Sequence, residues 1–175
     1  MPTDYNILID GRQTQAANGE RMAVVNPATG EQIATVPKCS EADVELAVAS
    51  AMKAAPGWAG MPMKARSDLM LRFARLIRDN AEELARLETM EQGSPIRKTV
   101  NFDVPLCADQ LEYFAGVARA LTGETLPVGP WCMSVTVREP LGVVGGISPW
   151  NFPALMVIWK LGAALVTGNT CIVKP

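Results

Sequence analysis

The chain has 175 residues, 49% of them hydrophobic and 19% charged, and this composition excludes a disordered chain. With 16 basic and 18 acidic residues its net charge is −2, and no Lys/Arg-rich run is present, so we expect no nucleic-acid partner. Because the chain has no histidine, its residues alone cannot assemble Ser-His-Asp or Cys-His catalysis. The 4 cysteines form no C-x-x-C pair, which predicts no metal site and favours a reducing compartment.

The N-terminus has no basic segment followed by an apolar core, so no signal peptide is predicted. The longest apolar run, PALMVIWKLGAALVTG, is interrupted by Lys160 and Gly162 and is short for a membrane span. We therefore predict a cytoplasmic protein that does not enter a membrane.

The first forty residues predict short strands joined by tight turns. Asp10-Gly11 and Asn18-Gly19 are dipeptides typical of two-residue hairpin turns, because they tolerate positive φ, and Gly30 precedes a further strand. We expect β-hairpins in this region.

Two helices are predicted next. Ser40 and Asp43 resemble the cap of a helix that runs to about Ala55, where the sequence APGW is expected to end it. A second helix is predicted after Pro62, with one apolar face that consists of Leu69, Phe73, Leu76 and Ile77.

Two more helices follow. Asn80 is predicted to be the N-cap of a third helix that stops near Gly93, and a fourth helix is predicted from about Asp103 to Leu121. The Arg, Glu and Asp residues on the remaining faces of these helices are interpreted as solvated surface.

From Trp131 the pattern changes to strands. Alternating Met133, Val135 and Val137 predict a strand over 131–139, and LGVVGGI predicts a buried parallel strand. A helix that stops at Gly168 and the strand NTCIVKP complete a βαβ unit. The fold class is therefore α/β, with N-terminal hairpins and helices leading into the first βαβ unit of a doubly wound, Rossmann-like sheet. A parallel sheet needs more strands than one crossover supplies, so we expect a truncated portion of a larger protein.

The segment ISPWNFP lies where the first parallel strand ends, the edge at which open α/β sheets bind ligands. It is not a G-x-G-x-x-G loop, so a bound dinucleotide must have its phosphates held in another way. Asn151 offers two uncharged N–H donors that suit an oxyanion, although the residues alone favour a helix N-cap.

Two further features have competing interpretations. Lys174 ends the second parallel strand, where its ammonium reaches either solvent or a ligand at the sheet edge. One face of the intervening helix is either a substrate wall or, more commonly, core packing. That face consists of Phe152, Leu155, Met156 and Trp159.

Residues 139–175, with the string Pro-Trp-Asn-Phe-Pro followed by Val-Lys-Pro, resemble the NAD(P)-dependent aldehyde dehydrogenase superfamily. The upstream stretches NPATGEQIATVP and ARSDLMLRFARLIRDNAEELARLETMEQGSP are similar to the N-terminal region of that family. The resemblance implies that Asn151 stabilises the oxyanion of the thiohemiacetal and that Lys174 contacts the adenosine ribose. It also implies a loop bordering the cofactor, formed by Ile147, Ser148, Pro149 and Trp150, and a substrate entrance lined by Phe152, Leu155, Met156 and Trp159.

The resemblance implies a homo-oligomeric enzyme that oxidises aldehydes to carboxylic acids with NAD or NADP. Residues 1–130 would belong to the cofactor-binding domain, 131–139 to an oligomerisation arm, and 140–175 to the first, incomplete dinucleotide-binding unit. In the family pattern the nucleophilic cysteine and the general-base glutamate lie beyond Pro175, and none of the 4 cysteines matches the nucleophile. The alternative hypothesis is a non-catalytic truncated product that binds nucleotide weakly or associates with full-length subunits.

Overall fold

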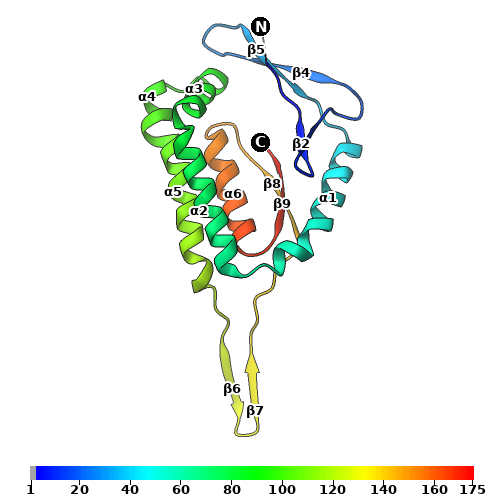
Figure 1. The fold of residues 1–175 in the computed structure, drawn as a ribbon, viewed down its shortest axis with the longest axis vertical. Helices are drawn as coiled ribbons and strands as arrows, with labels where there is room; N and C mark the ends of the chain where they lie inside the picture. Colours follow the sequence, from blue (N-terminus) through cyan, green and yellow to red (C-terminus); the bar gives the residue numbers. More distant parts are fainter. Residues whose placement is uncertain (1–2) are drawn as a thin grey trace.

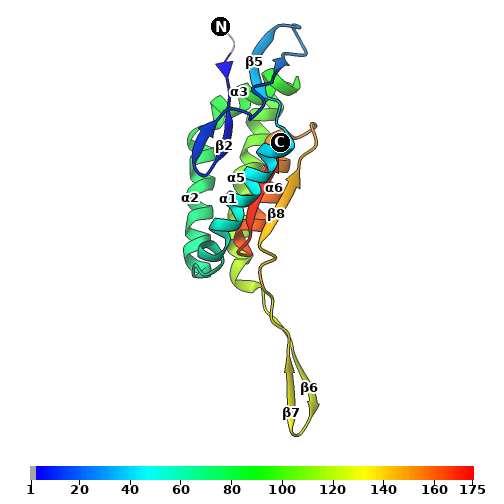
Figure 2. The ribbon, with the colours of Figure 1, turned by 90° about the vertical axis from the view of Figure 1, so that its right-hand side faces the viewer.

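The computed structural model describes residues 3–175. A body of helices lies between a group of short N-terminal strands at one end and a long hairpin, β6–β7, that projects from the other end (Figures 1 and 2). The mixed content of helices and small sheets confirms the predicted α/β class.

The N-terminal strands are β1 (Thr3–Asp4), β2 (Ile7–Ile9), β3 (Arg12–Thr14), β4 (Arg21–Val25) and β5 (Gln32–Pro37). β2 and β3 form the hairpin predicted from Asp10-Gly11, where both residues have positive φ. β4 pairs antiparallel with β5, and β1 pairs parallel with β5. The hairpin predicted at Asn18-Gly19 is wrong. That turn joins β3 to β4, which belong to different sheets, and Ala17 N donates instead to Asp43 Oδ1 at 2.8 Å.

Helix α1 (Glu41–Ala59) begins at the predicted capping box. The Asp43 carboxylate accepts bonds from Ser40 N at 2.7 Å and Ser40 Oγ at 2.8 Å. These bonds, with the one from Ala17, lower the pKa of Asp43. The predicted end near Ala55 is wrong, because the helix continues through Pro56. Trp58 Nε1 donates to Leu165 O at 2.9 Å, so a tertiary contact stabilises the last turn despite the proline.

The next helices are α2 (Met63–Asp79), α3 (Ala81–Gln92), α4 (Ile96–Lys98) and α5 (Val104–Val117). A π-helical turn (Thr99–Asp103) joins α4 to α5, and a 3₁₀ turn (Ala118–Ala120) follows α5. Gly93 ends α3 with a φ of 82°, as predicted. Asn80 does not cap α3 with its side chain. Its amide donates back to Leu76 O at 2.8 Å and therefore satisfies the end of α2.

Two predictions about helix faces are only partly right. Ile77 is buried and Phe73 packs against the core as predicted, but Leu69 and Leu76 are exposed. Met70 and Ala74 are buried in their place, because α2 turns a neighbouring stripe toward α5 and α6. The interpretation of all helix charges as solvated also fails, since buried charged residues include Arg66, Glu88 and Asp103. The core lies between α2, α5 and α6 (Figure 1).

The strand predicted over 131–139 is shorter in the structure and has a partner that was not predicted. β7 (Cys132–Val135) pairs antiparallel with β6 (Thr125–Gly129), and together they form the projecting hairpin (Figure 2). Pro127 and Gly129 within β6 are poor strand formers, which explains why the pattern gave no signal. Apolar side chains of this hairpin are exposed, including Trp131 and Met133.

The predicted βαβ unit is confirmed. β8 (Val143–Ile147) and β9 (Thr170–Lys174) are parallel, and α6 (Pro153–Val166) connects them. α6 covers one side of this pair and α1 the other (Figure 1). The helix packs closely over β8, where Gly146 has no side chain. A Cβ at that position would lie only 3.2 Å from Lys160 Cδ. No helix within residues 3–175 is long and apolar enough to cross a membrane.

Candidate functional site

The carboxyl ends of β8 and β9 bring the two parts of the predicted site together. Ile147 pairs in register with Lys174, and Ser148 N donates to Lys174 O at 3.0 Å. The segment that follows β8 therefore starts beside the lysine that ends β9.

The surface at this edge is unusually apolar. Ile147 is 76% exposed and Trp150 is 81% exposed, and Pro149 and Lys174 are exposed beside them. Ser148 is buried, and its Oγ has no hydrogen-bond partner among the described residues. A dinucleotide fits the exposed residues of this edge, because the Lys174 ammonium offers a polar contact and the apolar side chains offer a surface for a ring to cover.

Asn151 is exposed, and no hydrogen bond of its side-chain amide is found within residues 3–175. The favoured N-cap interpretation is wrong, since Phe152 is the N-cap residue of α6 and α6 starts at Pro153. Only the backbone oxygen of Asn151 is engaged, by Gln92 Nε2 at 3.4 Å. Both N–H donors of the amide are therefore free for a ligand.

The four residues proposed for a substrate wall have different surroundings. Leu155 is only 3% exposed and belongs to the core, so core packing describes its position in this chain. Phe152 and Met156 are half-buried against the same core, and Trp159 is 42% exposed. A role at a substrate entrance remains a prediction for these residues.

Sequence reasoning missed a buried polar cluster beneath the Asn151 segment, formed by Glu88, Lys98 and Asp103. Lys98 Nζ lies 2.7 Å from Asp103 Oδ2 and 4.1 Å from the centre of the Phe152 ring. Burial, followed by interaction with Asp103, raises the pKa of Glu88 to about 7. A signal was present, because Glu88 follows Ala85 at helical spacing and so shares its buried face.

The buried Cys107 and the half-buried Cys171 are not activated. Burial, with Glu88 and Asp103 adding to it, raises the pKa of Cys107 to about 12. Burial also raises the pKa of Cys171 in β9. Both thiols therefore stay protonated near neutral pH, as expected for inert apolar side chains.

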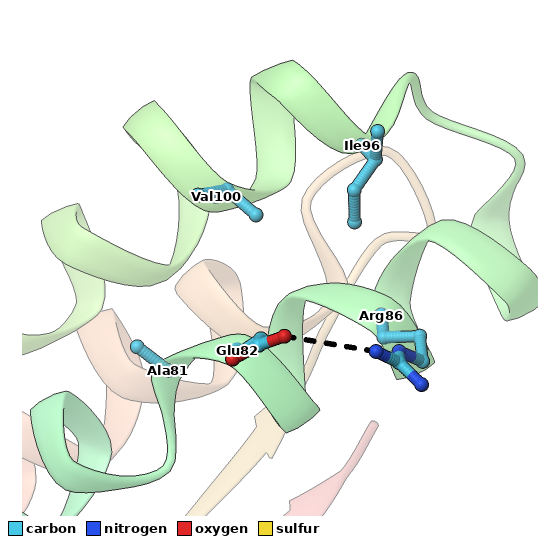
Figure 3. A pocket seen from close by; sticks show the side chains of 5 residues that line it. All are labelled: Ala81, Glu82, Arg86, Ile96 and Val100. Atoms are coloured by element: carbon cyan, nitrogen blue, oxygen red, sulfur yellow. Dashed lines mark ion pairs between the residues drawn. The ribbon is translucent and has the colours of Figure 1, made fainter.

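A hollow of about 490 Å³ lies elsewhere, between α3 and the α4 segment (Figure 3). Ile96 and Val100 point toward α3, where Glu82 pairs with Arg86 at 3.7 Å between Oε1 and Nη2. None of the predicted site residues lines this hollow, so it is separate from the sheet-edge site.

The chain is similar in sequence and in structure to known aldehyde dehydrogenases. Residues 14–175 match the sequence model of the aldehyde dehydrogenase family. The chain is 44% identical over 171 residues to DhaS, a candidate aldehyde dehydrogenase of Bacillus subtilis (strain 168), covering 97% of this chain and 34% of DhaS. The structure superposes on an NAD-dependent aldehyde dehydrogenase from Sinorhizobium meliloti with a TM-score of 0.95 and 40% identity, covering 100% of this chain and 36% of that one. It also superposes on PnpE in complex with nicotinamide adenine dinucleotide, with a TM-score of 0.95 and 40% identity, covering 98% and 35%.

The match extends over nearly all of the described chain and includes the sheet edge that carries Asn151 and Lys174. The chain belongs to the aldehyde dehydrogenase family. It spans about a third of the length of the relatives named above.

Proposed function

We propose that this chain forms the first third of an enzyme that oxidises aldehydes to carboxylic acids with NAD or NADP. The observation that carries the proposal is the side-chain amide of Asn151, which is unpaired among the described residues. It lies on the segment that follows β8, whose last residue, Ile147, pairs with Lys174 at the carboxyl edge of the parallel β-pair. Family membership supports the reaction type, and the share of the relatives that is covered supports a portion rather than a complete catalytic unit.

Asn151 would be the catalytic residue supplied by this portion. Its N–H donors would bond the aldehyde oxygen as that oxygen gains negative charge, and a thiol nucleophile and a carboxylate base would come from the rest of the enzyme. Pro149 and Pro153 restrict the backbone on both sides, so the amide needs little reorganisation. Losing such a donor typically lowers kcat by about 10²–10³-fold.

The cofactor would lie on the segment from Ile147 to Trp150 and on Lys174. When bound, the nicotinamide accepts the hydride that leaves the substrate carbon. The Lys174 ammonium would donate to ribose hydroxyls, and the exposed Ile147 and Trp150 would be covered by the cofactor and by the remaining chain. The cofactor is NAD in the PnpE complex, which supports NAD without excluding NADP here.

Other parts of the chain would complete the site and the assembly. Phe152, Met156 and Trp159 would line the substrate entrance with Leu155 behind them in the core. The β6–β7 hairpin, which includes most of the predicted 131–139 arm, would pack against another subunit of a cytoplasmic homo-oligomer. Its exposed Trp131, Met133 and Val135 support that role, because apolar side chains on a projecting hairpin gain from being covered. Residues 1–130 and 140–175 would form the cofactor-binding domain and its first βαβ unit.

The proposal is tested by purifying the full-length protein and measuring NADH and carboxylic acid formed from a panel of aliphatic and aromatic aldehydes with NAD⁺. We expect NADH and acid in equal amounts, with no NADH when the aldehyde is omitted. The 175-residue chain alone, assayed beside it, should give no turnover. A folded full-length protein that binds NAD⁺ but oxidises no aldehyde would overturn the proposal and favour the non-catalytic alternative.

A further inference from the structure

The N-terminus of α6 lacks a side-chain cap of its own. Its N-cap residue, Phe152, has no polar side chain, and no side-chain cap bond is formed there. Pro153 has no N–H, so the backbone N–H groups of Ala154 and Leu155 are the orphan donors of the first turn. A helix start of this kind attracts negative charge.

Residues of α3 and α4 lie against this helix start. Gln92 Nε2 donates to Asn151 O at 3.4 Å, and Lys98 Nζ stands 4.1 Å from the centre of the Phe152 ring. The Glu88 carboxyl faces the backbone N–H of Ala154, which lies two residues after Phe152. Residues 88–98 therefore lie against Asn151 and Phe152, which precede α6, and against Ala154 in its first turn.

The charges of this cluster do not balance if every group is ionised. Glu88 is 5% exposed and Asp103 is 0% exposed, and Lys98 is the cation paired with Asp103. Lys98 Nζ bonds Asp103 Oδ2 at 2.7 Å and Ser94 Oγ at 3.2 Å. Asp103 Oδ1 and both oxygens of Glu88 have no partner of ordinary hydrogen-bond geometry in the part of the chain that is described. A proton on Glu88 would let its O–H donate to Asp103 Oδ1, which satisfies both groups.

The titratable groups around Glu88 act in opposite directions. Burial and Asp103 raise the pKa of Glu88 to about 7, whereas Lys98 and the backbone of Ala154 lower it. Cys107, which faces the cluster from α5, has its pKa raised to about 12 and stays neutral. Glu88 is thus the member of this cluster that changes charge near neutral pH.

We propose that Glu88 is a positioning residue for the Asn151 segment, acting through a proton that it shares with Asp103. With the proton present, Glu88 donates to Asp103, and Lys98 remains between Asp103 and Phe152. Without it, the Glu88 carboxylate accepts from the N–H of Ala154 and competes with Asp103 for Lys98. The contacts that hold Phe152, and with it the neighbouring Asn151, therefore change. The inference rests on the proposed function in one respect, which is that Asn151 is taken as the donor to the aldehyde oxygen.

The test follows the side-chain amide resonances of Asn151 in the ¹⁵N-labelled 175-residue chain from about pH 5 to about pH 9, a range that brackets both the ordinary and the raised carboxyl pKa. We expect the resonances to shift with a midpoint near 7, where Glu88 titrates. Glu88→Gln should abolish this titration. Glu83→Gln, the same change on an exposed position of α3, should leave it intact. An Asn151 resonance that is insensitive to pH, or that titrates equally in Glu88→Gln, would overturn the inference.

A second variant covers the case in which Glu88→Gln fails to fold. Lys98→Met removes the cation that lowers the pKa of Glu88, so the midpoint should rise, and an unchanged midpoint would contradict the inference. In the full-length enzyme, Glu88→Gln should remove the same step from the pH profile of kcat. Because the resonance test needs no aldehyde, a failed activity assay and a failed titration are separate results.

Discussion

The two ends of α6 are built in opposite ways. At the C-terminal end, Arg66 Nε donates to Val166 O at 3.3 Å and Trp58 Nε1 to Leu165 O at 2.9 Å. Asn169 accepts from Gly142 N at 3.0 Å and donates to Thr167 Oγ1 at 2.8 Å. At the N-terminal end, the Asn151 amide and the Ser148 hydroxyl have no partner among residues 3–175. The closed end stabilises the βαβ unit, and the open end leaves the exposed Asn151 amide without a partner among the described residues.

The largest loss of stability is expected when the closed end is broken by Arg66→Met. The buried guanidinium also donates to Ala59 O at 3.2 Å, so its removal leaves several carbonyls without a donor. We expect the free energy of unfolding to fall by roughly 2–4 kcal/mol, measured by urea denaturation. The matched control is Arg86→Met on the exposed face of α3. Equal effects of the two substitutions would show that the closed end contributes nothing special.

Asn169→Ala should break the same end more mildly. It removes a buried side chain and leaves Gly142 N without its partner and Thr167 Oγ1 without one of its bonds, which typically costs about 1–3 kcal/mol. Thermal unfolding followed by circular dichroism measures the loss. A melting temperature unchanged from the wild type would contradict the assignment of Asn169 to the closed end.

Glu88→Gln should have the opposite sign and depend on pH. The folded-state pKa of Glu88 lies above its ordinary value of 4.5, at about 7, so the native state binds the proton more tightly than the unfolded state does. Wild-type stability therefore falls as pH rises from about 4.5 through about 7, and the cost is fully present above that range. Glutamine cannot ionise, so the variant should gain roughly 1–3 kcal/mol over the wild type at alkaline pH.

Urea denaturation of the wild type and Glu88→Gln at several pH values checks this prediction. The advantage of the variant should shrink as pH falls toward 4.5, the ordinary value of the carboxyl pKa. A difference in stability that is constant with pH would mean that Glu88 does not titrate in this window.

The smallest effect is expected at a surface ion pair that touches neither end of α6. Lys64 Nζ lies 2.6 Å from Asp68 Oδ2, but both side chains are mostly exposed. Lys64→Gln should therefore change the free energy of unfolding by less than about 0.5 kcal/mol. This value sets the baseline against which the other substitutions are judged, and a loss as large as that of Arg66→Met would remove the contrast.

Local signals were sufficient for most of the framework. The β2–β3 hairpin followed from Asp10-Gly11, the start of α1 from Ser40 and Asp43, and the end of α6 from Gly168, each of which depends on a few neighbouring residues. The parallel pairing of β8 and β9 followed from their apolar runs and the helix between them.

The failures occurred where distant residues decide. The continuation of α1 through Pro56 depends on Trp58 bonding Leu165, more than a hundred residues away. The Asn18-Gly19 turn joins strands that pair in different sheets, and the preceding Ala17 N donates to the distant Asp43. The buried position of Asp103 depends on the packing of α3 against the segment before α5, which spacing within one helix does not reveal.

The candidate site shows the same division. Asn151, Lys174 and the segment between β8 and α6 were named from the sequence, because strand ends and turn residues are local features. The N-cap interpretation of Asn151 was wrong by one residue, since α6 begins with Phe152 as its cap. The cluster beneath Phe152 was missed, although Glu88 lies three residues after Ala85 and therefore on the same face of α3.

The most direct test of the account compares two identical substitutions at the two ends of α6, Asn151→Ala and Asn169→Ala, in the full-length enzyme. Asn151→Ala should lower kcat for aldehyde oxidation by about 10²–10³-fold with no change in melting temperature. Asn169→Ala should lower the melting temperature and leave kcat near the wild-type value well below the transition. A loss of kcat below about threefold in Asn151→Ala, where an oxyanion donor should cost far more, would contradict the central claim.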